Sequence, residues 1–177
     1  MNRRSTLKFL VTGGALVTLG GGYHWLTRDR VHSHLAVDLA VQRLESLKLD
    51  NLATTGAWET ARTFDHLAQS VEFSMTGYPV MKSDLFQNTA GKLAFSVFQA
   101  SGRMKHGLDE AIPGEIVKTG SSDPAQARNR LLAALADFEK FEEPLEPHFA
   151  YGKLDKQQYA LAHVMHVNNH LEEFTTT

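Results

Sequence analysis

The sequence predicts an all-α protein: an antiparallel four-helix bundle with one additional short helix, preceded by an N-terminal segment outside the bundle. Three observations predict this class. From residue 31 onward, apolar residues recur three and four positions apart, residues that cap or break helices separate these runs, and no strand-like alternation occurs. We therefore expect a helical domain over residues 31–177.

The first two predicted helices lie before residue 77. The first covers residues 34–49 and is followed by a polar break at residues 50–56. In the second, apolar positions alternate by four and three residues, which is the spacing of a bundle seam, and Gly77 ends the helix. The predicted seam residues are Ala57, Ala61, Phe64, Ala68, Val71 and Met75.

Capping residues define the next two helices. Ser83 is placed to cap a third helix, which we expect to end near His106. Asp123 and Pro124 form an N-cap and first-turn pair for a fourth helix, which extends to about Phe141.

The last predicted helix begins with a capping-box pattern at Asp155 and carries three histidines on one stripe. At about 100° per residue, His163, His166 and His170 share a narrow sector with Tyr159, next to the apolar face. The histidines therefore border the buried side of the helix.

This stripe has two interpretations. A single histidine beside an apolar face is more often a hydrogen-bonded core residue than a metal ligand, but three unsatisfied imidazoles would each cost roughly 1–3 kcal/mol. A shared ion, a carboxylate or water must offset that cost. His166 and His170 are one turn apart, so both rings can reach one ion, and the pair His163 and His166 remains an alternative.

A third ligand would come from another helix, and the candidates are His66, His106, His148 and His163. We favour His66 because it lies inside a strongly amphipathic helix, whereas His106 is at a predicted helix end and His148 is in a loop where we expect exposure. His163 is two turns from His170, roughly 10 Å along the axis, which is too far for both to hold one ion.

Three imidazoles leave coordination positions open, as in a catalytic rather than a closed structural site. In such a site His163 is our candidate for proton transfer or a supporting hydrogen bond, and Tyr159 our candidate for substrate binding. Core packing is the alternative for Tyr159. The loop with His148 and Tyr151 either covers the pocket or lies at the surface.

The composition excludes several classes of protein. A formal net charge of −2 and a pI near 6.5 give no basic field for nucleic acid, which we do not expect as a partner. The chain contains no cysteine, so it has no disulfide, no thiolate nucleophile and no thiolate zinc site. Imidazole and carboxylate remain as the strong metal ligands.

Residues 1–30 differ from the rest of the chain. Arg3 and Arg4 stand in a run that resembles a twin-arginine export signal, and residues 9–26 contain no Asp, Glu, Lys or Arg. Eighteen residues is near the lower limit for a membrane span. We expect a twin-arginine-type signal or a membrane anchor, and a protein that is exported, either periplasmic or anchored to the inner membrane facing the periplasm. An ordinary N-terminal helix or tail is the alternative.

Two segments together resemble the DinB/YfiT-like superfamily of metal-dependent four-helix bundles: FDHLAQSVEFSMTGYP, which contains His66, and HVNNH, which spans His166 to His170. The wider pattern is similar to a domain-of-unknown-function branch of that superfamily. The resemblance implies a divalent ion, Ni, Zn, Fe or Mn, held by these three histidines. It also implies a small-molecule substrate, for example a thiol. The export-type N-terminus and the additional His163 depart from the superfamily pattern.

We therefore expect a metal-dependent enzyme of the thiol-dependent transferase or hydrolase type. The alternatives are a non-catalytic module of the cell envelope that binds a metal or a small ligand, and a helical interaction domain with satisfied core histidines. A seam on the first helix would also support a homodimer.

Overall fold

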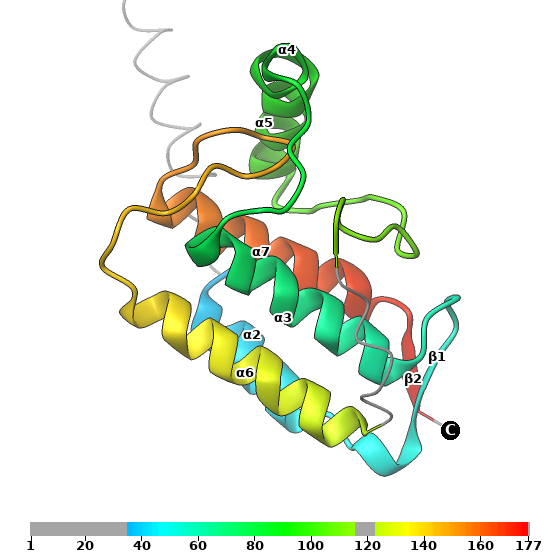
Figure 1. The fold of residues 1–177 in the computed structure, drawn as a ribbon. Helices are drawn as coiled ribbons and strands as arrows, with labels where there is room; N and C mark the ends of the chain where they lie inside the picture. Colours follow the sequence, from blue (N-terminus) through cyan, green and yellow to red (C-terminus); the bar gives the residue numbers. More distant parts are fainter. Residues whose placement is uncertain (1–34, 116–122, 177) are drawn as a thin grey trace, which may run out of the picture. The chain divides into compact units, whose positions relative to one another are not determined.

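The computed structural model describes residues 35–115 and 123–176, which form a mainly α-helical fold with one two-stranded sheet (Figure 1). The predicted helical class is confirmed for these residues, and the predicted signal or anchor, residues 1–30, lies outside them. No helix within these two ranges combines the length and apolar character needed to cross a bilayer. The elements are α2 (Val37–Ser46), a 3₁₀ turn (Leu49–Asn51), β1 (Leu52–Thr54), α3 (Thr60–Thr76), α4 (Asp84–Phe86), a π-helical segment (Gln87–Gly91), α5 (Lys92–Ser101), α6 (Pro124–Lys140), α7 (Lys156–Leu171) and β2 (Phe174–Thr176).

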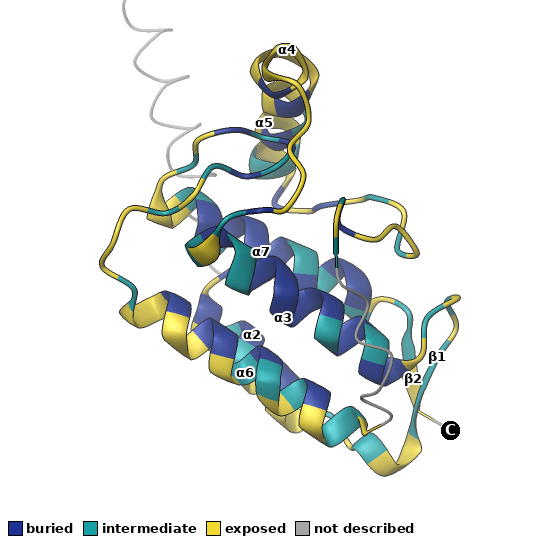
Figure 2. Ribbon diagram, viewed as in Figure 1, coloured by how far each residue is buried: buried dark blue, intermediate teal, exposed yellow. Residues whose placement is uncertain are grey.

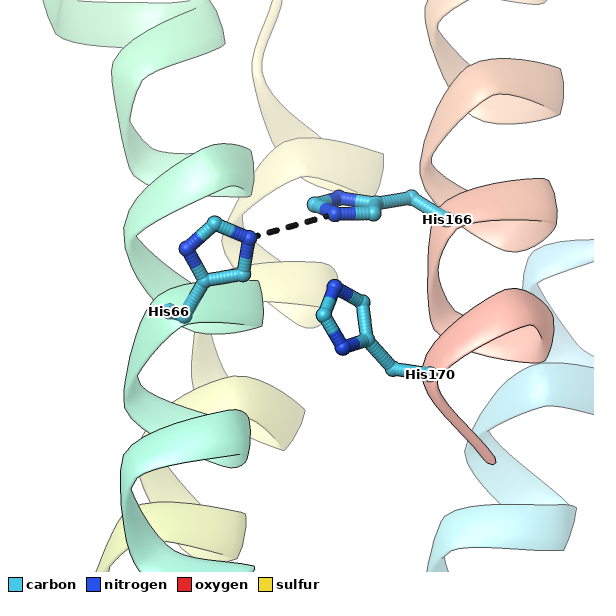
Figure 3. A group of neighbouring side chains, drawn as sticks. All are labelled: His66, His166 and His170. Atoms are coloured by element: carbon cyan, nitrogen blue, oxygen red, sulfur yellow. Dashed lines mark hydrogen bonds between the residues drawn. The ribbon is translucent and has the colours of Figure 1, made fainter. Parts of the chain in front are cut away.

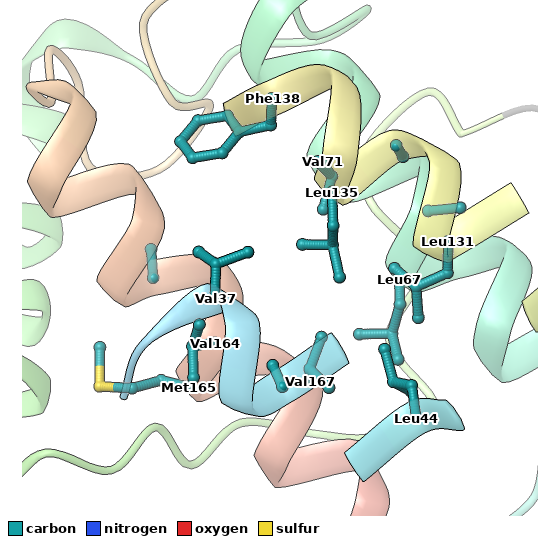
Figure 4. Close-up of a cluster of buried hydrophobic side chains, with 14 of the residues drawn as sticks. Val37, Leu44, Leu67, Val71, Leu131, Leu135, Phe138, Val164, Met165 and Val167 are labelled. Atoms are coloured by element: carbon teal, nitrogen blue, oxygen red, sulfur yellow. The ribbon is translucent and has the colours of Figure 1, made fainter. Parts of the chain in front are cut away.

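Helices α2, α3, α6 and α7 contribute the hydrophobic core (Figures 2 and 4). The seam predicted for the second helix packs here: Phe64 and Val71 of α3 are almost fully buried, together with Leu135 and Phe138 of α6. Burying a side chain of this size stabilises the fold by about 1.5–3 kcal/mol. The first predicted seam residue, Ala57, is exposed and precedes α3.

Arg130 fixes α3 against α6 at the surface of this core. Its guanidinium donates to both carboxylate oxygens of Glu72, at 2.9 and 2.6 Å, and to Asp65 at 2.8 Å. The hydrogen bonds that Arg130 donates to Glu72, and then the one to Asp65, raise the pKa of Arg130 against the opposing effect of its partial burial. Because Asp65 precedes His66 directly, this bidentate contact also fixes the helix that carries the candidate ligand.

The predicted helix caps are confirmed. The Ser83 hydroxyl accepts a hydrogen bond from the Phe86 N–H at 3.3 Å, and Asp123 accepts one from the Ala125 N–H at 2.9 Å. A complete capping box opens α7, in which the Asp155 side chain and the Gln158 side chain each accept from the backbone N–H of the other residue. These local bonds explain why the sequence patterns located these three helix starts.

The structure corrects three predicted boundaries. The first helix is Val37–Ser46 rather than residues 34–49. The third ends at Ser101 rather than near His106, because Gly102 adopts a left-handed conformation with φ of 65° and terminates the helix. The expectation of no strands is wrong for β1 and β2, which pair antiparallel from Leu52–Thr176 to Thr54–Phe174. Three-residue strands are too short to show an alternating pattern.

The elements α4, the π-helical segment and α5 form a continuous rod, residues 84–101, most of which lies outside the core formed by α2, α3, α6 and α7 (Figure 1), although Phe95 packs into that core. We call this segment the α4–α5 rod. Gly91 allows it to pass close to the loop after α6, because a Cβ at this position would overlap the carbonyl oxygen of Ala150. The glycine is therefore required by packing rather than by its backbone conformation.

We expect Gly91→Ala to destabilise the protein by about 1–3 kcal/mol, since backbone rather than a flexible side chain occupies the space. Urea denaturation followed by circular dichroism measures the effect. Ala90→Ser, at the exposed neighbouring position, is the matched control and should change stability by less than about 0.5 kcal/mol. Equal stabilities for both variants would show that the contact at Gly91 relaxes without cost.

Candidate metal centre

Three histidines converge between α3 and α7 (Figure 3). His66 comes from α3, and His166 and His170 come from successive turns of α7. One ring nitrogen from each lies within 4.8 Å of the other two, and the shortest approach is 3.3 Å between His66 Nε2 and His166 Nε2. The rings meet because their helices border the same core, so the residues that the sequence singled out as ligands lie together.

The geometry of this cluster fits a metal ion. Two imidazole nitrogens bound to one tetrahedral Zn²⁺ at about 2.0–2.1 Å would lie roughly 3.4 Å apart, close to the 3.3 Å between His66 and His166. Both ring nitrogens of His170 are buried without a hydrogen-bond partner, a cost of about 1–3 kcal/mol for each unsatisfied group. A shared cation would offset that cost.

His166 and His170 are held neutral, which is the form that binds metals. Burial, followed by the neighbouring His66 and His106, lowers the pKa of His170 to about 3. Burial also lowers the pKa of His166 well below its usual value, with a further contribution from the nearby imidazoles. At neutral pH both rings therefore offer a lone pair rather than a positive charge.

A carboxylate orients His66. Glu115 Oε2 lies 3.0 Å from His66 Nδ1 and also accepts from the Ile112 N–H at 2.9 Å, while Oε1 lies 3.5 Å from Arg62. Burial alone would raise the pKa of Glu115, but the hydrogen bond and charge of His66, with smaller contributions from Ile112 and Arg62, lower it. The ionised carboxylate accepts from Nδ1–H, which leaves the lone pair of His66 Nε2 directed into the cluster. This is the carboxylate–histidine arrangement found behind metal ligands.

Trp58 and Arg62 lie against the cluster. The Trp58 ring meets His66 edge-on, with ring centres 4.9 Å apart, and stacks on His170 at 6.2 Å and 11°. The Arg62 guanidinium lies 4.4 Å from the centre of the Trp58 ring. Arg62 stands one turn before His66 on α3, so its place on the same face could have been read from the sequence. No comparable pattern indicates Glu115, because this residue belongs to a loop.

A fourth histidine, His106, lies beside the cluster. Its ring centre is 4.9 Å from that of His166 and 5.3 Å from that of His170. His106 Nδ1 lies 2.7 Å from the Gly107 carbonyl and donates to it, which leaves Nε2 as an acceptor that is buried without a partner. The expected helix end at His106 concealed this position, because α5 stops earlier and a loop carries His106 back to α7. There its backbone N–H donates to Asn169 at 3.3 Å.

A cavity of about 540 Å³ adjoins these rings. The imidazoles of His66, His106 and His166 line it together with His163 and His148, and most of the remaining wall is apolar. Phe86, Phe98, Met104, Ile112, Pro113 and Phe149 provide much of this apolar wall. A small organic molecule could therefore lie against the imidazole cluster in a largely apolar pocket.

His163 lies in the cavity wall but outside the group of three converging nitrogens. The Ser74 hydroxyl donates to the Val71 carbonyl at 2.6 Å, so its oxygen is free to accept from His163 Nε2–H at 3.2 Å. Burial lowers the pKa of His163 to about 3. His163 is therefore a neutral, oriented side chain beside the cavity.

Tyr159 is fully buried in the core and does not line the cavity. Its hydroxyl donates to the Glu146 carbonyl at 2.6 Å, and its ring stacks on His163 with centres 5.4 Å apart. Burial, with smaller contributions from Tyr78, raises the pKa of Tyr159 far above its usual range. The observed contacts are those of a packing residue that supports His163 and the loop after α6.

The expected exposure of His148 is wrong, since only 9% of its surface is exposed. Its Nδ1 accepts from the N–H groups of Ala150 and Tyr151, at 3.1 and 3.3 Å, and its ring stacks on Tyr151 with centres 4.2 Å apart. Backbone hydrogen bonds in both directions join His148 to Gly152. The sequence is compatible with this loop either covering the pocket or lying at the surface. In the structure the loop forms part of the cavity wall.

Fold and site together define a mainly helical protein with a buried three-histidine cluster that could hold a metal beside an apolar cavity. The chain belongs to the family described as "Protein of unknown function (DUF1569)", whose model matches residues 27–177. Comparison with curated proteins and with solved structures gave no significant match.

Proposed function

We propose that this protein is a DinB-like four-helix-bundle protein that binds one divalent ion through His66, His166 and His170, and that it is a metal-dependent enzyme of the transferase or hydrolase type. One observation carries the proposal: three imidazoles converge, both buried ring nitrogens of His170 have no hydrogen-bond partner, and a cavity adjoins the cluster. Nickel, zinc, iron and manganese all accept such a nitrogen donor set.

When bound, the ion would act as a Lewis acid toward a substrate oxygen or stabilise a substrate thiolate. Side chains around the cluster would orient the ligands and the substrate. Glu115 holds the proton on His66 Nδ1, so that Nε2 stays available. His106 Nε2 can accept a hydrogen bond from a group lying in the cavity. His163 lines the same cavity and remains our candidate for a supporting hydrogen bond to the substrate.

The substrate that fits best is a small molecule with an apolar body and one metal-seeking group, such as a thiol. The cavity volume of about 540 Å³ and its apolar wall support this class. The same features favour one alternative, a non-catalytic module that binds a metal or a small ligand, because an apolar pocket can hold a molecule without transforming it.

Elemental analysis and turnover assays separate these proposals. Protein loaded with each of the four metals in turn, and then dialysed, should retain close to one ion per chain and should act on a member of a panel of thiol conjugates and esters. Retention of metal without turnover on the panel would favour the binding module. Failure to retain any of the four metals would contradict the metal proposal itself.

We further propose that residues 1–30 direct the protein out of the cytoplasm, either as a twin-arginine-type signal or as a membrane anchor through residues 9–26. The paired arginines and the uncharged run support this proposal. Cell fractionation of the full chain beside an Arg3→Lys, Arg4→Lys variant tests it. Unchanged distribution of the variant would contradict a twin-arginine signal.

Glu115→Gln should weaken metal binding about 10–100-fold, because the carboxylate that fixes the proton on His66 Nδ1 is replaced by a neutral amide. Competition with a coloured chelator measures the affinity. Glu110→Gln, a cavity-lining position in the same loop, is the matched control and should leave the affinity unchanged. Equal affinities for the two variants would show that Glu115 does not act on the metal through His66.

A further inference from the structure

The exposed large hydrophobic side chains of the described residues are confined to one short segment. They are Val80, Met81, Leu85, Phe86, Leu93 and Val97, with between 38 and 76% of their surface exposed. The last four belong to the α4–α5 rod, and the other two lie just before it. Scattered exposed hydrophobic residues are ordinary, but a cluster confined to one segment indicates a contact surface.

The rod is suited to present these side chains. It lies outside the four-helix core and is largely exposed along its length, as Figures 1 and 2 show. On α5, Leu93 and Val97 are one turn apart and are 68% and 56% exposed, while Phe95 between them is buried. The helix therefore has one face turned toward the protein and another apolar face turned toward solvent.

The same segment has the opposite charge to the rest of the described protein. Residues 80–105 contain four basic residues and one acidic residue, whereas the other described residues contain eight basic and eighteen acidic residues. The basic side chains are Lys82, Lys92, Arg103 and Lys105, and all four are exposed. An apolar face flanked by basic residues is typical of helices that lie in the interface of an anionic membrane.

The charge distribution favours a lipid surface over a second copy of the chain. A symmetric contact between two such rods would bring two sets of four basic residues together, which disfavours association. Anionic headgroups would instead neutralise them, while the apolar side chains enter the boundary of the acyl chains. An acidic remainder of the domain would keep the other surfaces off the membrane.

We propose that residues 80–105, centred on the α4–α5 rod, dock the protein on an anionic lipid surface. Leu85, Leu93 and Val97 enter the interface, and the lysines contact the headgroups. Since Phe86 and Phe98 of the rod also line the cavity, docking brings one wall of the cavity to the lipid surface. This surface is independent of the metal centre, so the inference does not rest on the proposed enzyme activity.

The absence of cysteine from the chain allows a direct test with the full-length protein. Leu93→Cys carries a single environment-sensitive NBD fluorophore at the centre of the proposed surface, and Val97→Cys gives a second position. Mixed with vesicles of phosphatidylcholine and phosphatidylglycerol, both labels should shift their emission to the blue, become protected from iodide, and be quenched by spin-labelled acyl chains. Glu142→Cys, labelled at an exposed position after α6, should remain accessible to iodide.

The lysines are tested in the labelled protein. Lys82→Gln with Lys92→Gln should lower the ratio of inserted to exposed label about fivefold for each residue replaced. The matched control, Lys140→Gln with Lys153→Gln, removes the same charge elsewhere and should leave the ratio unchanged. Labels at positions 93 and 97 that stay accessible to iodide on anionic vesicles would overturn the proposal. Protection that grows with protein concentration in the absence of lipid would overturn it in favour of a second copy.

Discussion

His66→Ala should weaken metal binding by more than about 100-fold. Loss of a residue that only hydrogen-bonds to a metal ligand weakens binding by about 10–100-fold, and loss of a ligand itself should exceed that range. His66 supplies the nitrogen from α3 in the three-histidine group, and without it the remaining pair comes from a single helix. Competition with a coloured chelator measures the dissociation constant of each metal. Cobalt absorption spectra of the loaded protein check the number of nitrogen ligands independently.

A matched control for this substitution is His148→Ala. His148 is also a buried histidine in the wall of the same cavity, but it lies outside the three-nitrogen group. Its removal should affect stability and leave the metal affinity unchanged. Circular dichroism of both variants separates loss of a ligand from loss of the fold.

His106→Ala distinguishes a three-histidine centre from a larger one. Its ring lies as close to those of His166 and His170 as the ring of His66 does, yet no nitrogen of His106 joins the group within 4.8 Å. A centre with His66, His166 and His170 as its ligands predicts that His66→Ala lowers the metal affinity more than His106→Ala does. A wild-type protein that binds metal, together with a His66→Ala variant of equal affinity, would show that the ligand set is wrong even though a metal is present.

Sequence patterns succeeded where the determining interactions are local. The capping box at Asp155 and the cap at Asp123 each involve residues within three positions of each other, so a few neighbouring residues determine where the helix starts. The stripe of His163, His166 and His170 likewise follows from the helical period alone. These features needed no knowledge of the rest of the fold.

Features that depend on distant partners were not predictable. The strand at Leu52–Thr54 pairs with residues more than a hundred positions away, and its three residues show no alternation of their own. Glu115 reaches His66 from a loop, where no period fixes the direction of a side chain. The contact of such a loop residue with the site can be identified only from the folded structure.

The predicted position of His106 was wrong because the predicted end of the third helix was wrong. The sequence predicts a third helix that ends near His106, which places this histidine at a helix end. The left-handed Gly102 releases the chain earlier, and residues 103–106 then return to α7, where Asn169 holds the backbone of His106. Because the helix ends about one turn earlier than predicted, His106 lies in a loop at the edge of the candidate site rather than at a helix end.

The free energy of unfolding should fall steeply below pH 6.5. Burial lowers the pKa of both His163 and His148 from 6.5 to about 3, with a contribution from His163 in the case of His148. The folded state thus keeps both rings neutral, while the unfolded state binds a proton on each as the pH falls through 6.5. Protons therefore favour unfolding, and the stability present above pH 6.5 is lost progressively down to about pH 3.

At pH 5, each of these histidines should lower the free energy of unfolding by about 2 kcal/mol, and the two together by about 4 kcal/mol. The linkage amounts to about 1.4 kcal/mol per pH unit for each group. Urea denaturation of metal-free protein at pH 7 and pH 5 measures the loss. His163→Gln keeps a donor near Ser74 but does not titrate, so its loss between the two pH values should be smaller than that of the wild type by about 2 kcal/mol. A wild-type stability that stays constant from pH 7 to pH 5 would mean that the rings of His148 and His163 reach water in the folded protein, and the cavity wall would then be more open than its hydrogen bonds indicate.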